Sequence, residues 1–513
     1  MLTKSNYLLG LQCPKLLWVS KNNKERIPEY DEMTLATFKN GEIIGDFAKK
    51  LFPEGIDLSK EGFKENLEKT KELLEKRVPL FEAGFSIDNL YSRADVLLPV
   101  EKNKWDILEV KSATKVKEVN IHDVSFQKYV YEKAGLKIRN CFVIHIDNQY
   151  AKEGEIEPEK FFTQNDITEK VEEFGLDIEK RIENMLKIIN SKEEPKCSIG
   201  VHCSDPFDCS ITGECWSHIK EGSVFEFYRM RKKKIFELYD SGIKHLNEVP
   251  DSVKLNDKQK IQRLIAEKKE THKDKKQIKH FLDNLKYPLY YLDFETINPA
   301  IPKFEGMKPY QRIPFQFSLH IQEKPNGELK HIGFLAEGIN DPRQKFLQSL
   351  KDNLGKEGDI LVYNQAFEKG VLRECCRSFP EFQEWCEKNI MSRVKDLWDV
   401  FKGFWYYDSK QKGSASIKAI LPLFSDLSHK DLDITKGDIA SYEYARVTYG
   451  SDDEILKDDD LKGLSEENIK KWVEDERKKV RDALEKYCEL DTLAEVEIVK
   501  GLGENIKMEE IRR

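Results

Sequence analysis

The chain has no long hydrophobic run: none of its 513 residues lies in a stretch of eighteen uncharged apolar residues. A membrane-spanning helix is therefore not expected. The first twenty residues are apolar at helical spacing but offer no small-residue cleavage site, so we do not expect a signal peptide. A cytoplasmic location follows, and there cysteine thiols stay reduced.

An excess of basic charge is also missing, because the formal net charge is −8. The balance is uneven. Residues 221–280 hold 16 Lys and Arg against 10 Asp and Glu, a local charge of +6. Such a patch on an acidic protein suits a nucleic-acid partner bound at one place, although a solvated helical face has the same composition. We expect no membrane partner, and the sequence identifies no protein partner.

Closely spaced cysteine pairs are absent as well. Cys13 stands alone, and four cysteines follow much later, with five residues between each and the next: Cys197, Cys203, Cys209 and Cys215. Zinc sites usually contain Cys-x2-4-Cys pairs, so their absence favours an iron–sulfur cluster, which needs four thiolates. Zinc and a loop of free thiols remain alternatives. The other five cysteines are expected to be buried small apolar residues.

Apolar periodicity divides the chain into two α/β regions joined by a helical segment. The first, 1–220, is predicted to contain helices at 3–20, 31–51, 61–77, 122–134 and 167–189, with strands at 81–87, 90–100, 105–112 and 139–147. The second, 286–513, begins with a strand at 289–295 and is largely helical near its end. Between them, 221–285 is predicted to be a basic helical linker or a nucleic-acid-binding module.

Acidic residues lie within two neighbouring strands of the first region. Asp95 belongs to one, and Glu109 and Lys111 to the next. Two carboxylates held together repel unless a cation lies between them, which favours Mg²⁺ or Mn²⁺. Lys111 shares a strand face with Glu109 and is expected to orient water or stabilise charge on a phosphate. Gln127 and Tyr131 share one face of the following helix.

This ordered set resembles the PD-(D/E)XK nuclease superfamily in its RecB-like branch. The resemblance implies a restriction-endonuclease-like fold, with Asp95, Glu109 and Lys111 as the catalytic motif and Gln127 and Tyr131 as the trailing motif. It implies metal binding by Asp95, Glu109 and the backbone carbonyl of Val110. Glu82 matches a further acidic position. Ala94 stands where relatives often carry Gly.

The cysteines extend this resemblance. Cys13-Pro14-Lys15 before Leu-Leu-Trp is similar to the N-terminal motif of iron–sulfur nucleases, in which one cysteine precedes the nuclease core and three follow it. The similarity implies a structural [4Fe–4S] cluster on Cys13, Cys203, Cys209 and Cys215. Cys197 is the alternative fourth ligand, because the spacing lacks the close pair usual in those proteins.

A second carboxylate group lies in the other region. Asp293 and Glu295 flank Phe294, so both side chains leave one face of a strand. Glu368 opens a helix after a buried strand, and Tyr487 and Asp491 lie one helical turn apart. Acidic residues in this order are expected to bind two Mg²⁺ ions for in-line phosphoryl chemistry, with the tyrosine holding the attacking water.

This region, about 288–505, resembles the DnaQ-like (DEDD) 3′–5′ exonucleases on a ribonuclease H-like fold. The resemblance implies Asp293, Glu295 and Asp491 as metal ligands and Tyr487 as the water-orienting tyrosine of the DEDDy subgroup. Glu368 stands where those enzymes usually have Asp. The pairing of both regions is similar to an uncharacterised bacterial family that joins an iron–sulfur RecB-like nuclease to a DnaQ-like exonuclease.

The sequence therefore predicts a metal-dependent nuclease with two active sites that acts by phosphodiester hydrolysis. The resemblances imply exonucleolytic action on ends or single strands. DNA is the expected partner ahead of RNA. Two alternatives stay open: a nucleic-acid-binding scaffold with inactive sites, motivated by Glu368, and an iron–sulfur redox sensor.

Overall fold

The chain forms two compact α/β units in a computed structural model that describes residues 1–456 and 465–511. The first unit contains 1–219 and 299–310, and the second contains 220–298 and 311–513. Residues 221–285, predicted to be a basic helical linker or a nucleic-acid-binding module, group with the second unit. No described helix is both long and apolar enough to cross a membrane.

The first unit is built on a seven-stranded mixed sheet in the order β2-β3-β4-β5-β6-β7, with the short β1 beside β4. Neighbouring strands from β3 to β5 are antiparallel, whereas β5 and β6 are parallel and are connected through helix α5. The strands are β1 Leu2–Thr3, β2 Ile56–Asp57, β3 Leu80–Ile87, β4 Leu90–Pro99, β5 Lys104–Lys111, β6 Lys137–Ile146 and β7 Phe162–Asp166.

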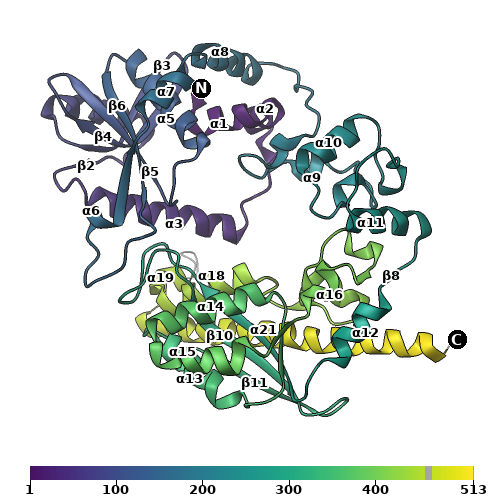
Figure 1. Ribbon diagram of the computed structural model, residues 1–513. Helices are drawn as coiled ribbons and strands as arrows, with labels where there is room; N and C mark the ends of the chain where they lie inside the picture. Colours follow the sequence, from purple (N-terminus) through teal and green to yellow (C-terminus); the bar gives the residue numbers. More distant parts are fainter. Residues whose placement is uncertain (457–464, 512–513) are drawn as a thin grey trace. The chain divides into compact units, whose positions relative to one another are not determined.

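Helices cover both faces of this sheet (Figure 1). The consecutive residues Ile107 and Leu108 of β5 show the alternation, since Ile107 packs beneath α1, α5, α7 and α8, and Leu108 packs on the opposite face near α3. The helices are α1 Lys4–Gln12, α2 Pro14–Asn22, α3 Glu32–Lys49, α4 Phe63–Leu73, α5 Glu118–Lys133, α6 Pro158–Phe161, α7 Thr168–Gly175, α8 Ile178–Ile189 and α9 Thr212–Cys215.

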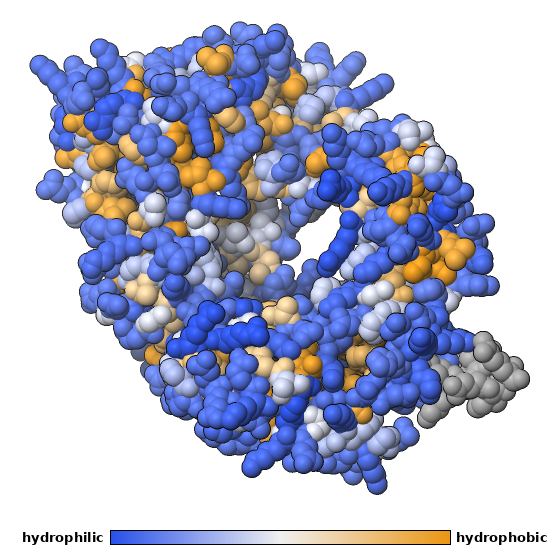
Figure 2. Space-filling view, viewed as in Figure 1, coloured by the Kyte–Doolittle hydropathy of each residue, from blue (hydrophilic) through white to orange (hydrophobic). Residues whose placement is uncertain are grey.

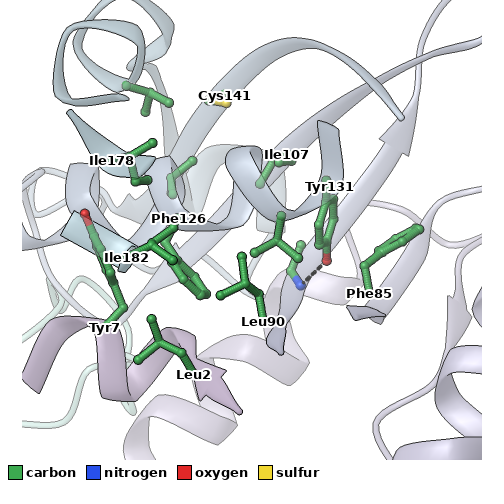
Figure 3. Packing of buried hydrophobic residues seen from close by; sticks show 14 of the residues in the cluster. Leu2, Tyr7, Phe85, Leu90, Ile107, Phe126, Tyr131, Cys141, Ile178 and Ile182 are labelled. Atoms are coloured by element: carbon green, nitrogen blue, oxygen red, sulfur yellow. Dashed lines mark hydrogen bonds between the residues drawn. The ribbon is translucent and has the colours of Figure 1, made fainter. Parts of the chain in front are cut away.

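Large aromatic side chains fill the core beneath α5. Phe126 stacks on Tyr7 with ring centroids 4.9 Å apart, and Tyr131 packs against Phe85. The Tyr131 hydroxyl accepts a hydrogen bond from the backbone N–H of Ala94 at 2.7 Å (Figure 3). It also donates to the carbonyl of Ala83. Tyr131 thereby fixes β3 and β4 next to Asp95.

The second unit contains a five-stranded sheet in the order β11-β10-β9-β12-β13. The hairpin strands β9, β10 and β11 are antiparallel, and β12 and β13 are parallel to β9. A separate pair, β8 and β14, lies outside this sheet. The strands are β8 His272–Lys273, β9 Leu289–Ile297, β10 Ile313–Gln322, β11 Leu329–Leu335, β12 Asp359–Val362, β13 Val394–Asp396 and β14 Tyr406–Tyr407.

Alternation along β9 places its two acidic residues on the face that packs against α21. Leu289 and Tyr291 belong to the core beneath α12 and α21, whereas Tyr290 and Leu292 belong to the core on the other face. The helices are α10 Lys232–Asp240, α11 Asp257–Lys268, α12 Lys275–Asp283, α13 Arg343–Asn353, α14 Gln365–Ser378, α15 Gln383–Cys386, α16 Trp398–Lys402, α17 Ile417–Ile420, α18 Gly437–Tyr449, α19 Asp452–Ile455 and α21 Glu466–Ile511.

Polar side chains cover most of the face seen in Figure 2, with apolar residues in small separate groups. This distribution agrees with a sequence in which 35% of the residues are charged. Most of the large apolar residues are buried in the cores on the two faces of each sheet.

Candidate carboxylate and cysteine sites

The first carboxylate site lies on β4 and β5. The pairing of Val96 with Leu108 puts Asp95 opposite Glu109, on one face of the antiparallel pair. The Asp95 carboxylate accepts the backbone N–H of Val110 at 2.7 Å. Burial and the nearby Glu109 raise the pKa of Asp95 to about 7. Two carboxylates at opposing positions of paired strands are a potential divalent-cation site.

Three side chains surround the Glu109 carboxylate. Lys111 Nζ lies 2.5 Å from Oε1, and Gln127 donates to Oε2 at 2.6 Å. Lys4 also donates to Oε1, at 3.0 Å. Burial alone would raise the pKa of Glu109, but Lys111 and Lys4 outweigh it and hold that pKa well below its ordinary value. Glu109 is therefore ionised.

Two members of this site did not emerge from the sequence. Asp123 of α5 is buried and lies 3.1 Å from Lys111 Nζ and 3.7 Å from Lys4 Nζ. Asp123 is four residues before Gln127 on the same helix face, and this spacing could have identified it from the sequence. Lys4 gave none, because it lies more than a hundred residues away from Glu109. Glu82 forms an ion pair with Arg93 at 3.3 Å.

The second carboxylate site joins β9 to α21. Asp293, Glu295 and Asp491 place carboxylate oxygens within 4.8 Å of one another. Burial raises the pKa values of Asp293 and Glu295 well above their ordinary range, and the neighbouring carboxylates add to this effect. Like charges gathered in a buried place require a compensating cation or protons.

Two buried glutamates complete the second site. Glu368 at the start of α14 is 2% exposed, and its Oε2 atom has no hydrogen-bond partner among the described residues. Burial and Asp293 raise the pKa of Glu368 to about 9. Glu495, one turn after Asp491 on α21, has the same orphaned atom and neighbours the same groups. Orphaned carboxylate oxygens beside a carboxylate triad fit a divalent cation bound there.

Three further side chains adjoin this site. His429, which sequence reasoning missed, places Nε2 2.8 Å from the Asp491 carboxylate. The ring of Tyr487 lies 5.8 Å from the ring of His429. Lys418 Nζ lies 3.5 Å from the Tyr487 hydroxyl. Burial raises the pKa of Tyr487 well above its ordinary value, with Asp491 adding to the effect, so the phenol stays protonated.

The candidate ligand cysteines of the first unit gather around Cys13, where α1 ends and α2 begins. Cys13 Sγ lies 3.7 Å from Cys197 Sγ, and the side chains of Cys209 and Cys215 pack into the same cluster around Cys13. His202, absent from our predictions, places Nε2 3.6 Å from Cys197 Sγ and 3.8 Å from Cys203 Sγ. Burial and the Cys13 thiol raise the pKa of Cys197 to about 12. Five thiols and one imidazole therefore offer more than the four ligands that a cluster or zinc needs.

Comparisons with known proteins give relatives without an assigned role. A family model described as "Domain of unknown function (DUF2779)" matches residues 290–416. This range includes Asp293, Glu295 and Glu368 and stops before Tyr487 and Asp491.

Two uncharacterised proteins are similar at 27% identity. One, from Mycoplasma genitalium, aligns over 45% of this chain and 34% of its own length. The other, from Ureaplasma parvum, aligns over 33% of this chain and 25% of its own length. The chain thus spans between a quarter and about a third of the length of these relatives.

Proposed function

We propose that this chain is a metal-dependent nuclease that hydrolyses phosphodiester bonds of DNA at two separate sites. The observation that carries the proposal is the convergence of Asp293, Glu295 and Asp491 within 4.8 Å, beside the orphaned oxygen of Glu368. On this proposal the first unit has a PD-(D/E)XK fold and the second a ribonuclease H-like fold. We place the protein in the cytoplasm.

At the second site, Asp293, Glu295, Asp491 and Glu368 would hold Mg²⁺ or Mn²⁺. The bound ions supply charge neutralisation on the phosphate and activation of water. Tyr487 keeps its proton, so its hydroxyl is able to orient an attacking water. His429 lies within hydrogen-bonding distance of the Asp491 carboxylate and would orient it. Lys418 supplies a positive charge near the Tyr487 hydroxyl. Action from a 3′ end is the polarity that we propose for this site.

At the first site, Asp95, Glu109 and the carbonyl of Val110 would hold the metal ion. Lys111 stays protonated, because the carboxylates of Glu109 and Asp123 outweigh burial and raise its pKa. Its partly exposed ammonium is suited to stabilise charge developing on a phosphate. Gln127 fixes the second oxygen of Glu109, and Tyr131 supports the strand that carries Asp95.

The cysteines would hold a [4Fe–4S] cluster that fastens α1 to the segment after α8. Cys13, Cys203, Cys209 and Cys215 remain the proposed ligands, with Cys197 the alternative. Anaerobically purified protein should contain about four iron and four sulfide per chain and absorb broadly in the blue. If the protein instead contains one zinc per chain and no sulfide, the cysteines form a zinc site and not an iron–sulfur cluster.

The activity test uses end-labelled single-stranded and double-stranded DNA and RNA with Mn²⁺. Asp95→Asn and Asp293→Asn should each remove one component of the degradation, and the double variant should leave the substrate intact. Lys69→Gln, on an exposed face of the first unit, is the matched control. Wild-type protein with its cluster intact that binds these substrates without cutting them would establish the scaffold alternative instead.

A further inference from the structure

A second cluster of metal-ligating side chains lies in the second unit, on the hairpin β10–β11. His320 and His331 are direct cross-strand partners, and Glu489 of α21 faces them. Their candidate ligand atoms lie within 4.8 Å of one another. His320 is 4% exposed, whereas the side chains of His331 and Glu489 are 31% and 48% exposed, so an ion has access from solvent.

Hydrogen bonds fix one nitrogen of each imidazole. Thr492 Oγ1 donates to the carbonyl of Glu489 at 3.1 Å, and a hydroxyl has only one proton. All three contacts of this hydroxyl are satisfied together when His320 Nδ1, at 2.8 Å, and Ser318 Oγ, at 2.6 Å, donate to it. Ser318 then accepts from His331 Nε2 at 2.9 Å.

This single arrangement of protons satisfies every contact and has a chemical consequence. His320 carries its proton on Nδ1 and His331 on Nε2, which leaves a lone pair on the other nitrogen of each ring. Burial lowers the pKa of His320 to about 4, and His331 adds to the effect, so the ring is neutral near pH 7. Metal-binding histidines are typically oriented by such a bond from the nitrogen that does not bind the metal.

The distance between His331 and Glu489 also fits a shared ion. His331 Nδ1 and Glu489 Oε1 are 3.6 Å apart, too far for a hydrogen bond. Two ligands at about 2.1 Å from one tetrahedral zinc ion are about 3.4 Å apart. Two imidazoles and one carboxylate form a donor set of the kind that binds zinc, with an open position for water.

We propose that His320, His331 and Glu489 bind one divalent transition-metal ion of the zinc class. The imidazole ligands distinguish this site from the all-carboxylate site at Asp293, which suits Mg²⁺ or Mn²⁺. The ion links α21 to the β10–β11 hairpin only two residues from Asp491. It thereby stabilises the position of the helix that carries Asp491 and Tyr487.

The test is Co²⁺ binding to the full chain in excess Mg²⁺, which occupies carboxylate sites but competes poorly for imidazole. Visible d–d bands report four-coordinate cobalt, and their intensity separates this site from six-coordinate carboxylate binding. A thiolate charge-transfer band would report cobalt at the cysteines and is followed separately. Wild-type protein should bind one Co²⁺ with nitrogen and oxygen ligands, and Zn²⁺ should displace it.

His331→Ala and Glu489→Gln should each weaken this binding at least about tenfold, and His280→Ala, at an exposed position of α12, should leave it unchanged. Both test positions are exposed, so the variants should fold, which far-ultraviolet circular dichroism checks. Equal cobalt stoichiometry and spectra in wild type and both variants would overturn the proposal. In that case the His331–Glu489 contact is only a surface contact between two polar side chains. Neither result depends on whether the Asp293 site is catalytically active, because the test measures cobalt binding and not hydrolysis.

Discussion

At the scale of single residues, Lys4 changes the electrostatics of the first carboxylate site. Its ammonium lies between Glu109 and Asp123. Burial would lower the pKa of Lys4, but Asp123 and Glu109 outweigh it and raise that pKa well above its ordinary value. A permanent positive charge therefore lies where a divalent cation would bind, and the two compete for the same carboxylates.

Lys4→Gln should tighten Mn²⁺ binding at the first site by about tenfold, or about 1.4 kcal/mol, because a repelling charge is removed. Calorimetric titration measures it in an Asp293→Asn background, which removes binding at the second carboxylate site. Lys69→Gln is the control, since that lysine pairs with Glu61 on the surface. Weaker or unchanged Mn²⁺ binding in Lys4→Gln would show that Lys4 does not act on the metal.

His122 provides a pH-dependent contribution to stability. Its ring contacts the ring of Phe174, and Nη1 of Arg181 is 3.2 Å from its Nδ1 atom. Burial lowers the pKa of His122, and Arg181 adds to the effect. The unfolded chain, with its ordinary value near 6.5, therefore binds a proton at a higher pH than the folded chain does.

The free energy of unfolding should consequently fall as the pH decreases below about 6.5. Urea unfolding between pH 7.5 and 5 measures this dependence. His122→Gln should make the slope less steep, and His280→Gln, at an exposed position, should not. An identical slope in wild type and His122→Gln would contradict the expectation.

At the scale of elements, helix α1 connects the carboxylate site to the cysteine cluster. It begins with Lys4 and ends at Gln12, directly before Cys13. The sequence predicted one helix over 3–20, but Pro14 cannot donate to the turn before it, so α1 ends and α2 begins at this point. The break gives Cys13 an extended backbone between two helices.

Gln12 joins this helix to the cysteine loop. Its buried amide donates to the carbonyls of His202 at 2.8 Å and Phe207 at 2.6 Å.

Gln12→Ala should lower the free energy of unfolding by about 1–3 kcal/mol, because two carbonyls lose their donor. The proposed iron–sulfur cluster should also lose iron to a chelator faster in this variant. Gln164→Ala, at an exposed position on β7, should change stability by less than about 0.5 kcal/mol. Equal rates of iron release from the two variants would show that Gln12 does not stabilise the proposed cluster.

At the scale of the molecule, the first unit is discontinuous in sequence. Its residues 299–310 come from the connection between β9 and β10. Ala300, Ile301 and Tyr310 pack against the core that contains Phe161. The Tyr310 hydroxyl donates to the carbonyl of Ser112 at 2.6 Å, one residue after Lys111.

Tyr310→Phe should therefore destabilise β5 and β6 by about 0.5–1.5 kcal/mol, the usual contribution of one hydrogen bond. Native-state hydrogen exchange in these strands measures the change. Tyr30→Phe, at an exposed position, should leave exchange unaltered. Unchanged protection in Tyr310→Phe would mean that the segment contributes only by apolar packing.

Local pattern was sufficient for much of the architecture. The predicted strands at 81–87, 90–100 and 105–112 agree with β3, β4 and β5 to within a residue or two, because alternation and turn residues are local signals. The helix predicted over 167–189 is two helices, α7 and α8, since Gly175 interrupts an apolar stripe that continues beyond it. The short strands β1, β2 and β7 carry too few residues for a pattern.

The sequence by itself determined the mixed α/β class and the residues that gather at Asp95–Glu109 and at Asp293–Glu295, because strand alternation and register place them on one face. Only the tertiary structure brought Lys4 to Glu109 and His429 to Asp491. It alone also brought Glu489 to His320 and His331. The physical reason is separation along the chain: packing of distant elements creates these contacts, and no local periodicity encodes them.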